Sequence, residues 1–145
     1  MLKLSRLTDY AVAALVRLSA AEGTETSPGI AAAIGIPEPT VAKVLKILAG
    51  QGFVLSTRGA RGGYRLSRPL SSITVAEIIV AIDGPIALTS CVEGSGGVCE
   101  SLLRCPVAGR WDPVNTAIRS ALQNISLADM AHAALPRGLR MSEVA

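Results

Sequence analysis

The pattern of apolar and polar residues predicts a series of short helices interrupted by one pair of strands. From Leu7 to Ala21, apolar side chains recur three and four residues apart, which is typical of a helix with one buried face. Thr8 stands where the N-cap of this helix is expected, and Gly23 follows its end. The apolar positions are Leu7, Ala11, Ala14, Leu15 and Leu18.

Residues 28–50 predict two further helices joined by a tight turn. Ser27 and Pro28 have the order of a cap followed by the first helical position, and this short helix closes at Gly35. Pro37 opens the next helix, and a glycine-containing turn between two helices is typical of a helix-turn-helix. The buried face of the second helix is expected at Val41, Val44, Leu45 and Leu48.

Two short strands are expected next, at residues 53–56 (FVLS) and 64–67 (YRLS). The sequence TRGARGG between them is a glycine-rich loop that carries two arginines. A helix-turn-helix followed by a basic hairpin is the order of elements in a winged helix. The predicted fold class is therefore mostly α with a small β wing, a winged helix-turn-helix followed by a long dimerisation helix.

The second half of the chain divides into segments of different character. A helix is expected at residues 73–82, with Thr74 as its cap, and another at residues 111–124. The apolar stripe on this later helix consists of Val114, Ile118, Ala121, Leu122 and Ile125. The predicted organisation is a winged helix-turn-helix domain at 1–84, a cysteine-containing loop at 85–110, a dimerisation helix at 111–130 and a flexible tail at 131–145.

Composition narrows the classes of protein that fit this pattern. Half of the 145 residues are hydrophobic but only 3% are aromatic, so the core must be aliphatic, and the excess suggests a surface buried against a second copy. No apolar run approaches the 18 residues that predict a membrane span. The first 20 residues read as an amphipathic helix and not as a signal peptide, so a cytoplasmic protein is expected.

Charge is distributed unevenly along the chain. Residues 1–72 hold nine Lys and Arg and four acids, a net charge of +5, whereas residues 73–145 hold five and seven, a net charge of −2. A basic half that coincides with a helix-turn-helix indicates nucleic acid as its partner. The alternatives are a solvated basic surface, or a winged helix that contacts another protein.

Candidate DNA contacts follow from how a helix-turn-helix binds. The N-terminal part of its second helix meets base edges in the major groove, which places Thr40 and Lys43 there and Lys46 nearer phosphate. Arg58 and Arg61 of the predicted wing are expected to reach a minor groove or the phosphate backbone.

The three cysteines form a second candidate site. Cys91, Cys99 and Cys105 lie within a glycine-rich stretch, with seven and five residues between them, which is not the spacing of a structural zinc site. Three thiolates on such a loop suit an iron–sulfur cluster, which then needs a fourth ligand. Redox-active thiols, or small buried side chains, are the alternatives. The sequence has no nucleotide-phosphate loop and no CxxC motif, so an enzyme is not expected.

Several segments together resemble one family of regulators. They are LSRLTDYAV at the start, IAAAIGIPEPTVAKVLKILAGQGFV, STRGARGGYRLSRP, ITVAEIIVAIDGPIALTSC, the cysteine loop and W-x13-ISLADM. In this order they resemble the IscR/NsrR/RirA family of winged-helix regulators that sense iron–sulfur clusters. GPIALTSC and LSRLTDYAV are most similar to the branch that regulates the Suf cluster-assembly genes.

The resemblance implies a homodimer that binds an imperfect palindrome in double-stranded DNA. It also implies that Cys91, Cys99 and Cys105 ligate a [2Fe–2S] or [4Fe–4S] cluster, and that Arg58 enters the minor groove. Asp9, within TDY, matches the acid that the other subunit contributes as a ligand in nitric-oxide-sensing members, and the resemblance makes it the preferred fourth ligand. The alternative is that Asp9 is only a charge or cap partner at the start of the N-terminal helix.

The sequence departs from the Isc regulator at two places. Ala108 stands where that regulator has a histidine three residues after its third cysteine, which argues against a histidine-ligated cluster. Pro39 and Ala42 replace polar side chains that contact bases, so its operator sequence is not transferred.

The predicted function is thus a cluster-sensing DNA-binding regulator, a repressor of iron–sulfur assembly or iron-homeostasis genes. The alternative is a cluster-free regulator of the same fold whose thiols sense redox state.

Overall fold

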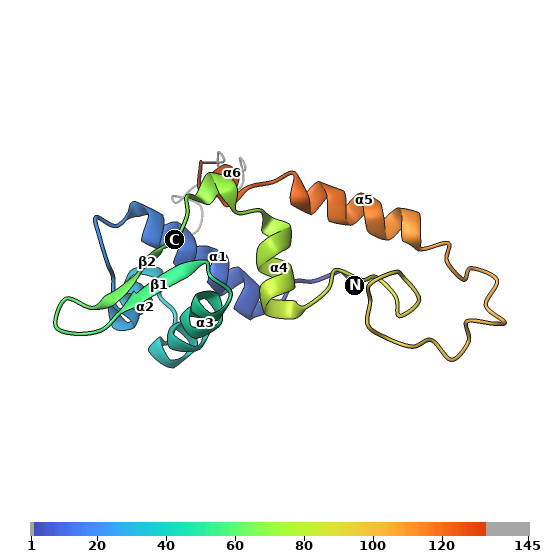
Figure 1. Cartoon of the computed structure of the whole chain (residues 1–145), viewed down its shortest axis with the longest axis horizontal. Helices are drawn as coiled ribbons and strands as arrows, with labels where there is room; N and C mark the ends of the chain where they lie inside the picture. The colour runs from blue at the N-terminus through green and yellow to red at the C-terminus, as the bar shows by residue number, and fades with distance from the viewer. Residues whose placement is uncertain (1, 133–145) are drawn as a thin grey trace, which may run out of the picture.

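The structure is a computed structural model that describes residues 2–132 of the chain. It is elongated, with three packed helices and a hairpin at one end and a long irregular loop at the other (Figure 1). The elements in chain order are α1 (Arg6–Ala20), α2 (Ser27–Ile34), α3 (Glu38–Gly50), β1 (Val54–Thr57), β2 (Gly63–Leu66), η1 (Leu70–Ser72), α4 (Val75–Asp83), α5 (Asp112–Gln123) and α6 (Leu127–His132).

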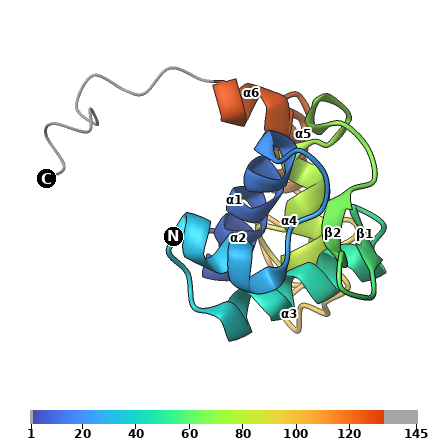
Figure 2. The same cartoon turned by 90° about the vertical axis from the view of Figure 1, so that its left-hand side faces the viewer.

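The core is aliphatic, as the composition predicts, and it lies between α1, α2, α3 and α4 (Figure 2). Helices α1 and α3 bury the stripes that their spacing indicates, because residues three and four apart share one helix face. The predicted α3 positions are all buried, and so are those of α1 except Leu7, which is half-buried. The winged helix-turn-helix fold predicted from the pattern is confirmed.

Two of the predicted helix caps are wrong. Ser5, not Thr8, caps α1: its hydroxyl oxygen accepts a hydrogen bond from the backbone amide of Thr8. Thr26 caps α2 in the same way, so Ser27 is the first helical residue. The Ser27 hydroxyl instead donates a 2.8 Å hydrogen bond to the Glu38 carboxylate, which ties the start of α2 to the start of α3.

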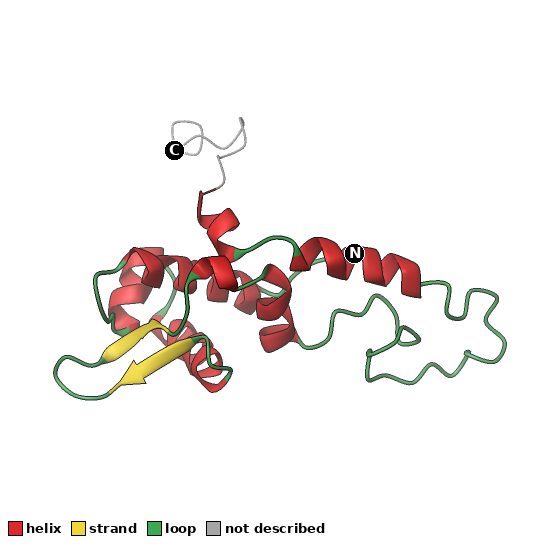
Figure 3. Cartoon of the chain, turned by 45° about the horizontal axis from the view of Figure 1, so that its top comes forward, coloured by secondary structure: helices red, strands yellow, loops and turns green. Residues whose placement is uncertain are grey.

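The wing is an antiparallel hairpin in which Val54 pairs with Leu66 and Thr57 pairs with Gly63 (Figure 3). Glu25 continues the pairing, because its backbone exchanges two hydrogen bonds with Tyr64. Gly63 has a φ of 150°, and a Cβ there would lie 2.6 Å from the Glu25 carbonyl oxygen. Only glycine therefore lets the hairpin approach the segment that precedes α2 this closely.

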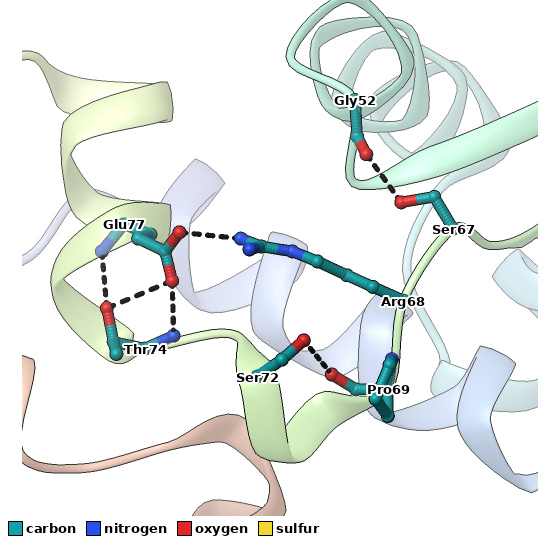
Figure 4. A network of polar contacts seen from close by, with 7 residues as sticks. All are labelled: Gly52, Ser67, Arg68, Pro69, Ser72, Thr74 and Glu77. Carbon is teal, nitrogen blue, oxygen red and sulfur yellow. Dashed lines mark hydrogen bonds and ion pairs between the residues drawn. The ribbon is translucent and has the colours of Figure 1, made fainter.

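The connection from the wing to α4 is held by a polar network (Figure 4). Arg68 forms a 2.6 Å ion pair with Glu77, and its guanidinium also lies over the Phe53 ring. Glu77 and Thr74 form the capping box that begins α4, which confirms Thr74 as the predicted cap. Burial would raise the pKa of Glu77, but hydrogen bonds from Arg68 and Thr74 outweigh it and hold the pKa below its ordinary value.

After the cysteine loop, α5 returns toward the winged helix, where its end is fastened. The Ile125 carbonyl accepts a hydrogen bond from the Val75 amide, and the Leu127 amide donates one to the Ile73 carbonyl. Leu127 is fully buried and begins α6, which packs on α1 and η1. The helix expected at 111–130 is interrupted after Gln123, and its last part belongs to the separate helix α6. The tail expected from residue 131 begins later, since α6 continues to His132, and the rest of that tail lies outside the described residues.

None of the helices in residues 2–132 combines the length and apolar character that crossing a bilayer requires.

Candidate functional site

Helix α3 presents the candidate DNA-reading residues on its outer side. Lys43 and Lys46 are exposed and Thr40 is half-buried, because the opposite face of the helix is occupied by the buried stripe. The Ser27–Glu38 hydrogen bond fixes the start of this helix against α2. The start of α3 is therefore tied to α2, and the outer side of its N-terminal half is open to a partner.

The wing carries the two predicted arginines at its tip. Arg58 and Arg61 are both exposed in the loop between β1 and β2. A hollow of about 460 Å³ separates this loop from the start of α2, and Arg58 lines it together with hydroxyl-bearing side chains. Those side chains are Thr26, Ser27, Ser56, Thr57 and Tyr64.

The basic side chains of α3 and of the wing tip form no ion pair within residues 2–132. Within residues 2–132 the two ion pairs are Arg17–Glu25 and Arg68–Glu77. The four predicted DNA-contacting cations take part in neither pair. Unpaired cations of this kind attract nucleic acid, because neutralising its phosphates releases the counterions condensed on it. These cations are Lys43, Lys46, Arg58 and Arg61.

The cysteines lie on the irregular segment between α4 and α5, at the end of the molecule away from the wing (Figure 1). All three are free and half-buried. Cys91 and Cys99 line one hollow of about 390 Å³, whereas Cys105 is not part of its lining. The Thr89 hydroxyl lies 3.1 Å from the Cys91 sulfur.

Asp9 is exposed near the start of α1, and it does not join the cysteines in this single chain. Among the described residues, no three His, Cys, Asp or Glu side chains are gathered closely enough to hold one metal ion. Iron–sulfur clusters require soft sulfur donors. The three thiols are the kind of donor that an iron–sulfur cluster requires, and they lie on one loop, where two of them line the same hollow. The three thiols are not gathered in this single chain, and no fourth ligand joins them within residues 2–132.

The base of the cysteine loop rests on α5 through residues that sequence reasoning missed. Asn115 is 2% exposed and binds the backbone of Ile86 and Leu88, and Asp112 binds the backbone of Glu93. The only sequence signal was spacing, because Asp112 and Asn115 share a helix face beside the predicted apolar stripe.

The apolar stripe of α5 is only partly covered within one chain. Ile118 and Leu122 are half-buried and line a groove of about 350 Å³. Leu2 and Leu4 of the segment before α1, residues 2–5 (the N-terminal arm), line the same groove. Val114, by contrast, is 43% exposed. An apolar helix face that a single chain leaves open is typical of an interface between copies.

Comparisons with known proteins agree with this architecture. The Rrf2 family model, described as an iron-dependent transcriptional regulator, matches residues 4–133. A Mycobacterium tuberculosis protein provisionally named an HTH-type transcriptional regulator is 36% identical over 93% of this chain and 84% of its own length. The HTH-type transcriptional regulator IscR of Klebsiella pneumoniae is 34% identical over 85% of this chain and 76% of its own.

A solved structure has the same fold. CymR, described as the global cysteine regulator of B. subtilis, superposes with a TM-score of 0.74 at 28% identity, covering 93% of this chain and all of that one.

Proposed function

The chain belongs to the Rrf2 family of transcriptional regulators, and from this premise we propose that it is an iron–sulfur-cluster-sensing repressor that acts in the cytoplasm. Its target genes in this proposal encode iron–sulfur cluster assembly or iron homeostasis. Membership of a regulator family confirms the expectation that the protein is not an enzyme.

One observation carries the proposal. Cys91 and Cys99 line the same hollow on a loop that follows directly from the winged helix, and Cys105 lies on the same loop. In this proposal the three thiols of this one loop supply three of the four ligands. The similarity to IscR supports this assignment.

The fourth ligand in this proposal is the partner subunit's Asp9. In one chain Asp9 is exposed and forms no ligand group with the cysteines, so this proposal needs a second copy to bring it to them. When bound, the cluster supplies a linkage that iron shortage, oxidants or nitric oxide break. The chain's own part is to hold the donors and to present Asp9 on the rigid start of α1.

We also propose a homodimer that binds an imperfect palindrome in double-stranded DNA. The open apolar face of α5 and the groove beside the N-terminal arm support a second copy as the occupant. A dimeric reader requires its two recognition helices at a fixed spacing, which matches the repeat of the half-sites. Lys43 and Thr40 would then meet base edges, and Lys46, Arg58 and Arg61 would meet phosphate or the minor groove.

A cluster-free thiol sensor is the second candidate. It is favoured by the three free thiols, by the absence of a converged ligand group within residues 2–132, and by the fold shared with a regulator described as a cysteine regulator. In that case Cys91 and Cys99, which share a hollow, are the pair positioned to react together.

One experiment separates the two candidates. The protein is purified without oxygen and analysed for iron and acid-labile sulfide, and then footprinted in loaded and stripped forms on the promoter beside its own gene. We expect stoichiometric iron and sulfide and a footprint that differs between the two forms. Protein without iron or sulfide, whose footprint changes with a thiol oxidant, would establish the second candidate instead.

A further inference from the structure

A polar stripe on α5 holds the backbone that leads into the cysteine loop. Asp112, Asn115 and Arg119 follow one another at intervals of three and four residues, so they lie along one helix face. Each side chain bonds the backbone of the segment 86–93, at Glu93, at Leu88 and Ile86, and at Ile86 respectively. The segment therefore runs along α5 in the opposite direction and is tied to it at successive points.

Asn115 makes the strongest of these ties. Its amide nitrogen donates a 3.0 Å hydrogen bond to the Ile86 carbonyl, and its amide oxygen accepts one of 2.9 Å from the Leu88 amide. The side chain is 2% exposed, so neither backbone group can exchange its partner for water without opening the contact. The Arg119 contact with Ile86 is longer, at 3.4 Å, and is a weaker addition.

Cys91 lies between two of these ties. Leu88 is bonded to Asn115 three residues before it, and Glu93 is bonded to Asp112 by a 3.1 Å hydrogen bond two residues after it. Both flanks of Cys91 are bonded to side chains of the same helix, which restricts the movement of Cys91 along α5. Cys105, by contrast, lies within the loop that the Glu93–Asp112 bond closes.

The far end of α5 is fixed to the DNA-binding unit. Backbone hydrogen bonds join Ile125 to Val75 and Leu127 to Ile73, and the Leu127 side chain is fully buried in the core. Helix α5 is thus held by the winged helix at one end and by the Cys91 segment along the rest of its length. A displacement of that segment must either break the ties or tilt the helix.

We propose that Asn115 is the positioning residue that couples the state of the cysteine site to the orientation of α5, with Asp112 as its auxiliary. The inference rests on the proposed function, in which the cysteines sense. Asn115 binds no ligand itself; it makes the position of Cys91 and the direction of α5 interdependent. The open apolar face of α5 then changes its direction together with the cysteine site, and the spacing of the DNA-reading units follows.

The first test uses the protein without a cluster, so it does not depend on the sensing chemistry. Alkylation rates of the three thiols are measured by peptide mass spectrometry in the wild type, Asn115→Leu and the control Asn124→Leu, which changes an exposed asparagine at the end of the same helix. We expect Asn115→Leu to raise the rate at Cys91 at least fivefold while the rate at Cys105 stays within twofold. An equal rise at all three thiols, which indicates general destabilisation, overturns the inference, and so does an unchanged rate at Cys91.

The second test measures the coupling itself. The dissociation constant for the promoter DNA is determined for loaded and cluster-free protein, and the ratio of the two is compared between variants. Coupling between sites typically amounts to about 5–150-fold. We expect that ratio in the wild type and in Asn124→Leu, and a ratio near one in Asn115→Leu.

Each result has one meaning. A wild-type ratio of one contradicts the proposed function, whatever the variants do. A wild-type ratio that Asn115→Leu retains contradicts this inference and leaves the proposed function standing. Should Asn115→Leu fail to fold or to load, Asp112→Ala is measured instead, because it removes the bond to Glu93 at a partly exposed position. We expect Asp112→Ala to reduce the ratio of the two dissociation constants at least twofold. An unchanged ratio in that variant overturns the inference.

Discussion

The Thr8 hydroxyl donates a 2.8 Å hydrogen bond to the Asp83 carboxylate, joining the first turn of α1 to the last residue of α4. Thr8 is 1% exposed. The Ser5 amide also donates to the Asp83 carboxylate, and the Ser5 hydroxyl donates to the Thr8 hydroxyl oxygen. The bond spans 75 residues of sequence and holds the start of α1, including the neighbouring Asp9, in a fixed place.

Replacing Thr8 by valine keeps the shape of the side chain and removes the hydroxyl. We expect Thr8→Val to lower the free energy of unfolding by about 1 kcal/mol, the usual net value of one hydrogen bond, since Asp83 remains solvated. Urea denaturation measures the change. Thr116→Val, at an exposed position of α5 whose hydroxyl makes no hydrogen bond within residues 2–132, serves as the control and should change stability by less than half as much.

The Asp83 carboxylate makes part of this stability depend on pH. Burial would raise its pKa, but hydrogen bonds from Ser5 and Thr8 outweigh it and hold the pKa below the ordinary value. A depressed pKa in the folded state stabilises the protein above the unfolded pKa of about 3.9, and this contribution is lost as pH falls through the folded pKa. The stability difference between wild type and Asp83→Asn should therefore shrink from pH 6 to pH 3 in urea titrations; a constant difference would contradict the assignment.

Arg58 is the wing residue whose loss should weaken DNA binding most clearly. It is exposed at the hairpin tip and takes part in neither ion pair of the described residues. We expect Arg58→Ala to weaken binding to the promoter DNA about tenfold and to reduce the slope of log K against log salt by roughly one. Arg104→Ala removes the same charge from the cysteine loop and should leave the slope unchanged.

Each cysteine should be necessary for the cluster. We expect Cys91→Ala, Cys99→Ala and Cys105→Ala each to abolish the visible absorption of protein reconstituted with iron and sulfide without oxygen. Ser101→Ala, on the same loop, should load normally. Absorption retained by all three cysteine variants would refute the proposed ligand set.

Asp9 should affect how long a cluster survives. If the partner subunit's Asp9 completes the ligand set, Asp9→Ala should still load but lose its absorption in air at least several times faster than the wild type. Glu22→Ala removes an exposed acid just beyond the other end of α1 and is the matched control. Equal bleaching rates in Asp9→Ala and wild type would remove Asp9 from the site.

Local spacing was enough to predict most of the elements. The buried faces of α1 and α3 and Thr74 as the cap of α4 follow from residues within four positions of one another. The hairpin with its basic tip follows from the single stretch 53–67. The cap predictions at Thr8 and Ser27 failed because each helix start offers two hydroxyl residues, Ser5 and Thr8 for α1 and Thr26 and Ser27 for α2, and local sequence does not choose between them. Tertiary contacts decide between them, because the Thr8 hydroxyl donates a hydrogen bond to Asp83 and the Ser27 hydroxyl donates one to Glu38.

The sequence by itself determined the winged-helix architecture, the basic character of its reading face and the presence of three thiols on one glycine-rich loop, because periodicity, charge and composition are local properties. Only the tertiary structure decided where those thiols lie and what holds them. Asn115 reaches Ile86 across 29 residues, and Leu127 closes the core beside Ile73. Such contacts join α5 and the residues after it to the segments that flank α4, so no pattern within a single helix predicts which side chains they bury.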